Sequence, residues 1–174
     1  MVLVSGVPGT GKSTIAGPLA AELGFGLLAK DTIKEVLADE LAADLRADPA
    51  LASRRLGAAA MELLWALAAG IPAVVLDANF WVTDPRLPGR ITALSDRPVE
   101  VFCTCPAELA AQRYAARLGR LHPVHAQGAG ADRLGAAAVA RSGRPVGIGA
   151  VLTVDTTGPV DVPALAVAIR PLLP

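Results

Sequence analysis

The sequence predicts an α/β fold of three layers, in which helices cover both faces of a parallel five-stranded sheet. Short apolar runs alternate with longer amphipathic stretches along the chain, and this alternation is typical of parallel sheets with helical connections. The chain has 174 residues, which suits one domain with its own core. Hydrophobic residues make up 53% of it and aromatic residues 3%, so we expect a core of mainly Ala, Leu and Val. We therefore expect residues 1–174 to form a single domain.

Apolar runs and helical periodicity divide the chain into elements. The predicted strands are Val2–Ser5, Phe25–Ala29, Ala73–Asp77, Val99–Thr104 and Ala150–Asp155. The predicted helices are Gly11–Leu23, Thr32–Arg46, Pro49–Ala69, Pro85–Ser95, Pro106–Arg120, Arg133–Ser142 and Val162–Leu172. The stretch Leu121–Asp132 has Gly and Pro residues and no periodicity, which predicts a loop.

The overall charge disfavours polymeric and membrane partners. Lys and Arg number 16 and balance 16 Asp and Glu, so no broad positive field is available to gather nucleic acid. No apolar run approaches the roughly 20 residues that span a bilayer, and the first residues resemble a strand more than a signal peptide. We therefore expect a cytoplasmic protein. Cys103 and Cys105 lack further metal ligands beside them, and we interpret both as small buried hydrophobes.

The stretch GVPGTGKST follows the first predicted strand and leads into a helix. Its Gly6-x-x-x-x-Gly11-Lys12-Ser13 spacing is that of a P-loop, and the flanking strand and helix supply the context that this motif requires. Backbone N–H groups of such a loop surround phosphate oxygens, and the lysine reaches the β and γ phosphates. We therefore expect ATP or GTP here, with Mg²⁺ on the serine. The residues expected to bind the nucleotide are Gly6, Val7, Pro8, Gly9, Thr10, Gly11, Lys12, Ser13 and Thr14.

Two aspartates follow predicted strands at the edge of the sheet where the P-loop lies. Asp31 comes after the second strand, where its carboxylate could accept the proton of an incoming hydroxyl or cap the next helix; both roles can coexist. Asp77 ends the run AVVLD and resembles a Walker-B acid that would hold Mg²⁺ together with Ser13, although a strand-end turn also explains it. Asn79 and Phe80 follow it and are candidate contacts of the acceptor.

Arginines supply the remaining charge of the candidate site. Arg113, Arg117 and Arg120 stand at i, i+4 and i+7, which places them on one helical face next to the predicted loop. We expect a small helical lid around residues 113–135, whose arginines close over the γ phosphate, with Arg117 the first candidate. His122 and His125 lie on the same segment, and without a third ligand we interpret them as lid or acceptor contacts.

Together, GVPGTGKST, Asp31, VVLDANF and the arginine-bearing lid resemble the small P-loop kinases that phosphorylate hydroxyl groups. Chloramphenicol phosphotransferases, the kinase domains of polynucleotide kinases and the zeta toxins share this plan. The resemblance implies the sheet order 2-3-1-4-5, an Asp31 that activates the acceptor hydroxyl, and a lid arginine at Arg117 or a neighbour. These families commonly have Ser or Asp before the base, whereas this chain has Lys30.

Three functions remain in competition at this point. The leading one is an ATP-dependent phosphotransferase acting on a hydroxyl of a small molecule, and the resemblance makes an antibiotic or a nucleoside-like natural product an expected acceptor. The second is a polynucleotide 5′-hydroxyl kinase, against which zero net charge and few aromatic residues argue. The third is a nucleotide switch or regulatory ATPase that transfers no phosphate.

Overall fold

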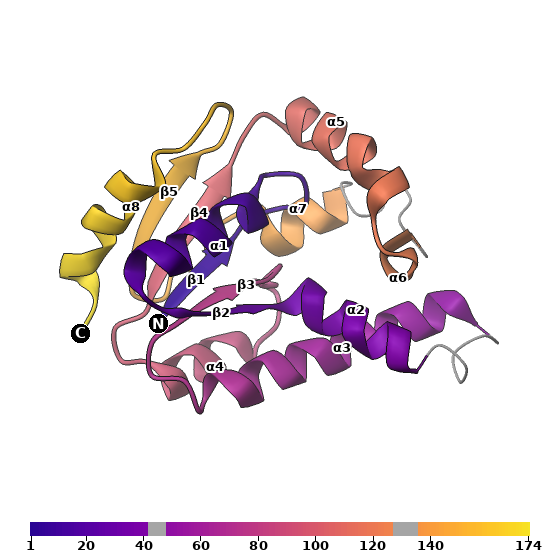
Figure 1. The fold of residues 1–174 in the computed structure, drawn as a ribbon, viewed down its shortest axis with the longest axis horizontal. Coiled ribbons are helices and arrows are strands. Elements are labelled where there is room, and N and C mark those ends of the chain that lie inside the picture. The colour runs from indigo at the N-terminus through magenta and orange to yellow at the C-terminus, as the bar shows by residue number, and fades with distance from the viewer. Residues whose placement is uncertain (42–47, 127–135) are drawn as a thin grey trace.

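The computed structural model describes residues 1–41, 48–126 and 136–174. Its centre is a five-stranded sheet in the order β2-β3-β1-β4-β5, and every neighbouring pair is parallel. This confirms the predicted fold class and strand order (Figure 1). The strands are β1 (Val2–Ser5), β2 (Gly26–Ala29), β3 (Val74–Asp77), β4 (Val99–Thr104) and β5 (Ala150–Asp155).

One face of the sheet is covered by α1 (Lys12–Leu23) and α8 (Val162–Ile169), and the short η3 (Arg170–Leu172) follows α8. Alternate residues of β1 separate the two faces, because successive strand side chains point in opposite directions. Val2 and Val4 face this layer and are fully buried. They pack in one cluster with side chains of α1 and α8 such as Leu19 and Ile169.

The opposite face carries α3 (Pro49–Ala68) and α4 (Leu87–Leu94). Leu3 of β1 points to this side and is buried with Leu64 and Trp65 of α3. Phe80 belongs to the same cluster: it is 1% exposed, and its ring centroid lies 5.7 Å from that of Trp65. The expectation that Phe80 contacts the acceptor is therefore wrong, because its ring is enclosed by the core.

The remaining helices extend from the carboxyl ends of the strands. They are α2 (Lys30–Glu40), α5 (Ala107–Arg117), η1 (Leu118–Arg120), α6 (Pro123–Ala126) and α7 (Ala136–Ser142). Helix α2 pairs with α3, and α6 contacts both of them, so α5 and α6 stand across from α2 (Figure 1).

Two predictions for these helices need correction. Helix α2 begins at Lys30, two residues before the predicted start, with Ala29 at its N-cap position. The alternative role of Asp31 as the N-cap is therefore wrong, since Asp31 lies in the first turn. The predicted loop Leu121–Asp132 contains α6, and its end at residues 127–132 lies outside the described residues, as do residues 133–135 of the expected lid.

A buried carboxylate fixes the segment that joins α7 to β5. Glu100 of β4 is fully buried, and its carboxylate accepts hydrogen bonds from the Ser5 hydroxyl and from the backbone N–H groups of Val146 and Gly147. Three donors replace the water that this carboxylate loses in the core. Among the described helices, none is long and apolar enough to cross a membrane.

Candidate active site

The P-loop joins β1 to α1 and is shaped by glycines with positive φ. Gly6, Gly9 and Gly11 have φ of 133°, 88° and 79°, which residues with a side chain rarely adopt. A Cβ at Gly9 would also collide with the carbonyl oxygen of Ala110 on α5. Inside the loop the Thr10 hydroxyl donates to the Val7 carbonyl over 2.8 Å. The glycines therefore allow the loop to lie directly against α5.

Lys12 is the first residue of α1 and lies under the P-loop. Its Nζ donates to the Val7 carbonyl oxygen over 2.9 Å, and the residue is 9% exposed. Burial lowers the pKa of Lys12 to about 8, although Asp77 and Asp31 favour its charged form. A cation that has lost hydration without gaining a matched anion is a good partner for a phosphate group.

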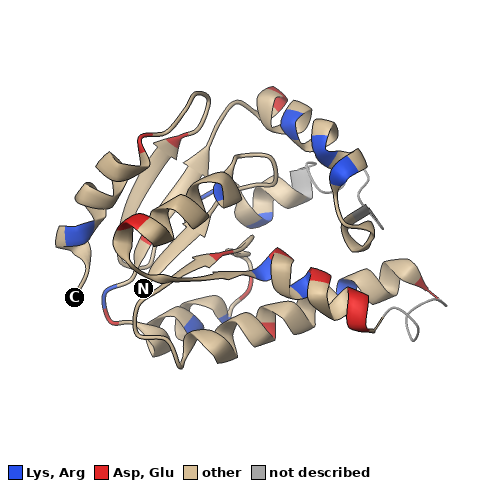
Figure 2. Cartoon of the chain, viewed as in Figure 1, with Lys and Arg blue, Asp and Glu red and all other residues tan. Residues whose placement is uncertain are grey.

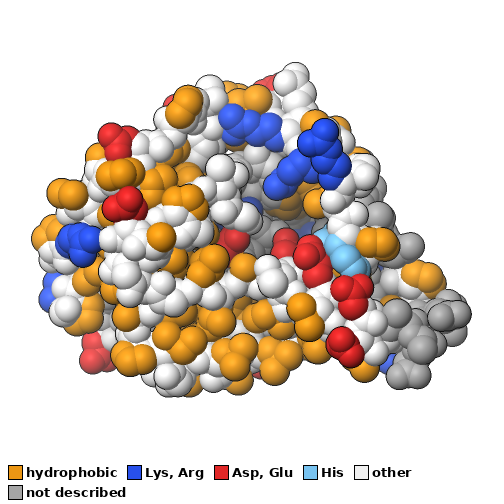
Figure 3. Space-filling view, in the orientation of Figure 1, with side chains coloured by type: hydrophobic (Ala, Val, Ile, Leu, Met, Phe, Trp, Pro, Cys, Tyr) orange, Lys and Arg blue, Asp and Glu red, His pale blue; other side chains and the backbone are white. Residues whose placement is uncertain are grey.

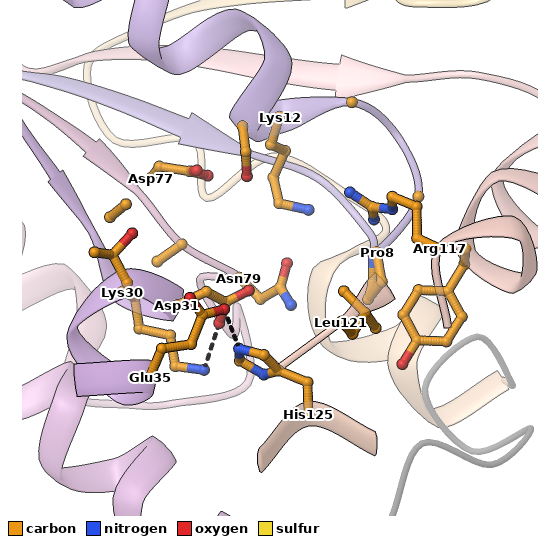
Figure 4. Close-up of a pocket in the computed structure, with 17 residues that line it drawn as sticks. Pro8, Lys12, Lys30, Asp31, Glu35, Asp77, Asn79, Arg117, Leu121 and His125 are labelled. Carbon is orange, nitrogen blue, oxygen red and sulfur yellow. Dashed lines mark hydrogen bonds and ion pairs between the residues drawn. The ribbon is translucent and has the colours of Figure 1, made fainter. Parts of the chain in front are cut away.

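A cavity of about 300 Å³ opens next to Lys12, between the P-loop, α2 and the α5–α6 segment. Figure 4 shows Lys12, Asp77 and Arg117 on one side of it and Lys30, Asp31, Glu35 and His125 on the other. The predicted site residues that line the cavity are Pro8, Gly9, Gly11, Lys12, Ser13, Asp31, Asp77, Asn79, Arg117 and His125. Those predicted residues that do not line it are Gly6, Val7, Thr10, Thr14, Phe80, Arg113, Arg120 and His122.

Asp77 and Ser13 meet on the phosphate side of the cavity. Asp77 ends β3 and is 7% exposed, and its carboxylate accepts a hydrogen bond from the Ser13 hydroxyl. Burial raises the pKa of Asp77, while this hydrogen bond and the charge of Lys12 oppose the rise. A carboxylate and a hydroxyl are hard oxygen donors of the kind that Mg²⁺ uses beside water and phosphate oxygens. The pair fits a magnesium site.

Asp31 faces the open part of the cavity from the first turn of α2. Its side chain is 63% exposed, and its Oδ1 lies 3.0 Å from the Nζ of Lys30. Burial by the surrounding chain pulls the pKa of Asp31 upward, but the charges of Lys30, His125 and Lys12 outweigh this, and the pKa is lowered. The carboxylate is thus ionised at neutral pH and can accept a proton.

Helix α6 borders the cavity through His125 and is fastened to α2 and α3. His125 is 4% exposed, and its Nε2 lies 2.9 Å from a carboxylate oxygen of Glu35. Burial lowers the pKa of His125, against the opposing effects of Asp31 and Glu35. Next to it, the Val124 carbonyl accepts hydrogen bonds from Lys34 and from the Ser53 hydroxyl.

His122 makes a second connection between the same elements. Its Nε2 lies 3.0 Å from Asp39, and its Nδ1 accepts the backbone N–H of Val124 over 3.1 Å. Because Nδ1 accepts, Nε2 carries the proton and donates to Asp39. His122 therefore holds α6 on α2 from outside the cavity.

The three arginines of the expected lid have different surroundings. Arg117 lines the cavity, and its charge disfavours the charged form of Lys12. Arg113 donates to the carbonyl oxygens of Thr156 and Thr157, at 2.8 and 3.1 Å, in the segment between β5 and α8. Arg120 lies in η1, where the helix winding changes. Of the three, Arg117 is the one placed to meet a phosphate group in the cavity.

Charge is separated across the cleft. The ribbon carries mostly basic positions along α5, and along α2 it carries acidic positions together with the two lysines of that helix (Figure 2). In the space-filling view the hollow lies between these two rims, with histidine at its end (Figure 3). The acidic rim includes Asp31, Glu35 and Asp39, which are four residues apart and share one face of α2.

Seven lining residues were not predicted as part of the site: Ala29, Lys30, Thr32, Glu35, Ala78, Tyr114 and Leu121. Glu35 could have been found from its spacing, since it follows Asp31 by one helical turn. Tyr114 is 7% exposed, and its hydroxyl has no hydrogen-bond partner among the described residues. Nothing in the local sequence marks Leu121.

A family model described as an AAA domain matches residues 1–137. The chain belongs to the AAA domain family. The solved structures that resemble this AAA domain include a candidate kinase from Chloroflexus aurantiacus, with 31% identity and a TM-score of 0.83 over 99% of this chain and 97% of that one. No curated protein has a matching sequence.

Two more distant structures share the fold of this AAA domain. One is a gluconokinase from Sinorhizobium meliloti, with 17% identity and a TM-score of 0.56 over 96% of this chain and 89% of that one. The other is a shikimate kinase from Acinetobacter baumannii in complex with shikimate, with 19% identity and a TM-score of 0.52 over 98% and 90%. The AAA domain described here thus has the fold of small P-loop kinases.

Proposed function

We propose that this protein is an ATP-dependent O-phosphotransferase that moves the γ phosphate to a hydroxyl group of a small molecule. The observation that carries this proposal is the cavity in which Lys12 and Arg117 face Asp31. Phosphate-binding cations and an ionised carboxylate are the groups that a kinase needs on opposite sides of the transferred phosphate. ATP is the expected phosphate donor, with GTP as the alternative.

The proposed transfer follows from this geometry. An acceptor hydroxyl next to Asp31 gives its proton to the carboxylate while its oxygen forms a bond to the γ phosphorus, and the bond from that phosphorus to the leaving nucleoside diphosphate breaks. Lys12 and Arg117 stabilise the negative charge on the phosphate oxygens. Ser13 and Asp77 would hold Mg²⁺, which supplies further neutralisation of the phosphate charge.

The size of the cavity supports a small acceptor. About 300 Å³ is at the lower end of the range for small-molecule sites, and the transferred phosphate must share this space. The side of the cavity opposite the P-loop is closed by contacts between the α6 segment and helices α2 and α3. These contacts are made by His122, His125 and Val124. Hydroxylated antibiotics, nucleosides and sugars are the acceptors to be tested first.

The test is a screen for transfer followed by one substitution. Purified protein with ATP and Mg²⁺ is incubated with single hydroxylated compounds, and mass spectrometry detects the gain of one phosphate. The variant Asp31→Asn keeps the shape of the side chain but cannot take a proton, so kcat for any acceptor found should fall by about 10²-fold or more, with ATP affinity unchanged. ATP consumption that is independent of every added alcohol, or full activity of Asp31→Asn, would contradict the proposal.

A further inference from the structure

Lys30 and Asp31 form an ion pair between consecutive residues of a helix. Side chains at i and i+1 diverge around a helix and do not normally face each other. Here the Nζ of Lys30 nonetheless lies 3.0 Å from Oδ1 of Asp31, in the first turn of α2. Such a geometry needs space beside α2 in which the lysine can turn back.

Helix α3 provides that space at Gly57. A Cβ built on Gly57 would lie 4.0 Å from Nζ of Lys30 and 3.9 Å from Cε of Lys34. Glycine inside a helix is less favourable than alanine, so its presence here has a cost in helix stability. A larger side chain at this position would extend into the volume that the two lysine stems occupy, so the glycine keeps room for the ion pair.

The pair leaves one oxygen of the carboxylate for the acceptor. Lys30 is bonded to Oδ1, and the Asp31 side chain is 63% exposed and lines the cavity; among the described residues, Oδ2 has no hydrogen-bond partner. When an acceptor fills this space, the carboxylate loses its water, which favours the protonated form. The ammonium group beside it opposes that effect.

We propose that Lys30 is a positioning residue, which holds the Asp31 carboxylate through Oδ1 in its ionised form so that Oδ2 receives the acceptor proton. This inference rests on the proposed function, in which Asp31 is the base. The other titratable or charged groups that line the same cavity are Lys12, Glu35, Asp77, Tyr114, Arg117 and His125. Among the described residues, Lys30 is the charged residue in direct contact with Asp31, with its Nζ 3.0 Å from Oδ1.

The first test is the titration of Asp31 without any acceptor. Carboxyl ¹³C NMR follows its protonation, with the signal assigned by its absence in Asp31→Asn. In Lys30→Gln the midpoint should rise by about 1 pH unit, which is a tenfold increase in proton affinity. Lys30→Arg keeps the cation and should keep the low midpoint. The matched control is Arg97→Gln, which removes one exposed cation in the turn before β4, at the other end of the sheet.

The proposal is overturned if Lys30→Gln moves the Asp31 midpoint no further than Arg97→Gln does. A second measurement separates positioning from binding of an anionic acceptor. With an acceptor from the screen, Lys30→Gln should lower kcat and leave KM unchanged, whereas a rise in KM alone would overturn the proposal. Because the titration needs no acceptor, it reports on Lys30 even if no phosphate transfer is found. If Lys30→Gln fails to fold, Gly57→Leu should displace Lys30 and raise the same midpoint, and an unchanged midpoint overturns the proposal.

Discussion

The affinity of the protein for nucleotide should depend on pH through Lys12. Burial lowers the pKa of this lysine to about 8, so the protonated fraction falls from about nine tenths at pH 7 to about one tenth at pH 9. If phosphate groups bind the protonated form, the Kd for Mg-ATP rises about tenfold over this range, or about 1.4 kcal/mol. An ordinary lysine would remain charged and produce almost no change.

Isothermal titration calorimetry at pH 7, 8 and 9 measures this effect. The control is Lys12→Arg, whose guanidinium stays protonated throughout, so its affinity for nucleotide should be lower but independent of pH. The neighbouring thiol does not interfere, because burial raises the pKa of Cys103 to about 12. A wild-type Kd that is as flat as that of Lys12→Arg would refute the link between burial of Lys12 and phosphate binding.

Three further substitutions test other parts of the site. Asp77→Asn should raise the Mg²⁺ concentration needed for half-maximal activity more than it raises the acceptor KM, and a change in acceptor KM alone would move Asp77 to the acceptor pocket. Gly9→Ala should weaken nucleotide binding, since its Cβ meets the Ala110 carbonyl, whereas Gly89→Ala, with open space around it, should leave binding unchanged in the same titration. Phe80→Ala should lower the free energy of unfolding in urea by about 3–5 kcal/mol, and a small loss would argue against its place in the core.

The sheet could be predicted from the sequence because its strands carry their own signal. Strands β1, β3 and β4 are buried on both faces and give largely apolar runs, whereas the edge strands β2 and β5 are partly exposed. Strands β1, β4 and β5 have the predicted bounds, and β2 and β3 begin one residue later than predicted. The P-loop could be predicted for a related reason, because its glycines are required by local backbone geometry. Features that depend on neighbouring residues in this way can be recognised from a short stretch of sequence.

The start of α2 was harder to predict from the sequence, and the error changed which residues were expected near Asp31. Asp31 is a favourable capping residue, so the sequence pattern favoured a helix beginning after it. In the structure the helix continues directly from β2 and has no side-chain cap. This shift of two residues places Lys30 inside the helix, where its contact with Asp31 depends on α3 rather than on the local sequence.

The lid could be predicted only in part, because its contacts join distant residues. A four-residue helix such as α6 is too short to show periodicity. His125 within it is positioned by Glu35 of α2, and His122 just before it by Asp39. The i, i+4, i+7 arginine pattern assumed one continuous helix, but the winding changes at Leu118. Arg113 binds carbonyl groups that lie more than forty residues later in the chain.

The buried Glu100 has a consequence for how this scaffold could diversify. One segment of the chain runs from α5 to the start of β5. Near its beginning, Ala110 packs on the P-loop, and near its end, the backbone N–H groups of Val146 and Gly147 are bound by Glu100. Both ends of this segment, at Ala110 and at Val146 and Gly147, are therefore fixed by contacts that do not involve the cavity-lining residues Leu121 and His125 between them. We therefore expect changes in the part of this segment that follows Arg117 to alter the proposed acceptor site while Lys12, Ser13, Asp77 and Arg117 keep their places.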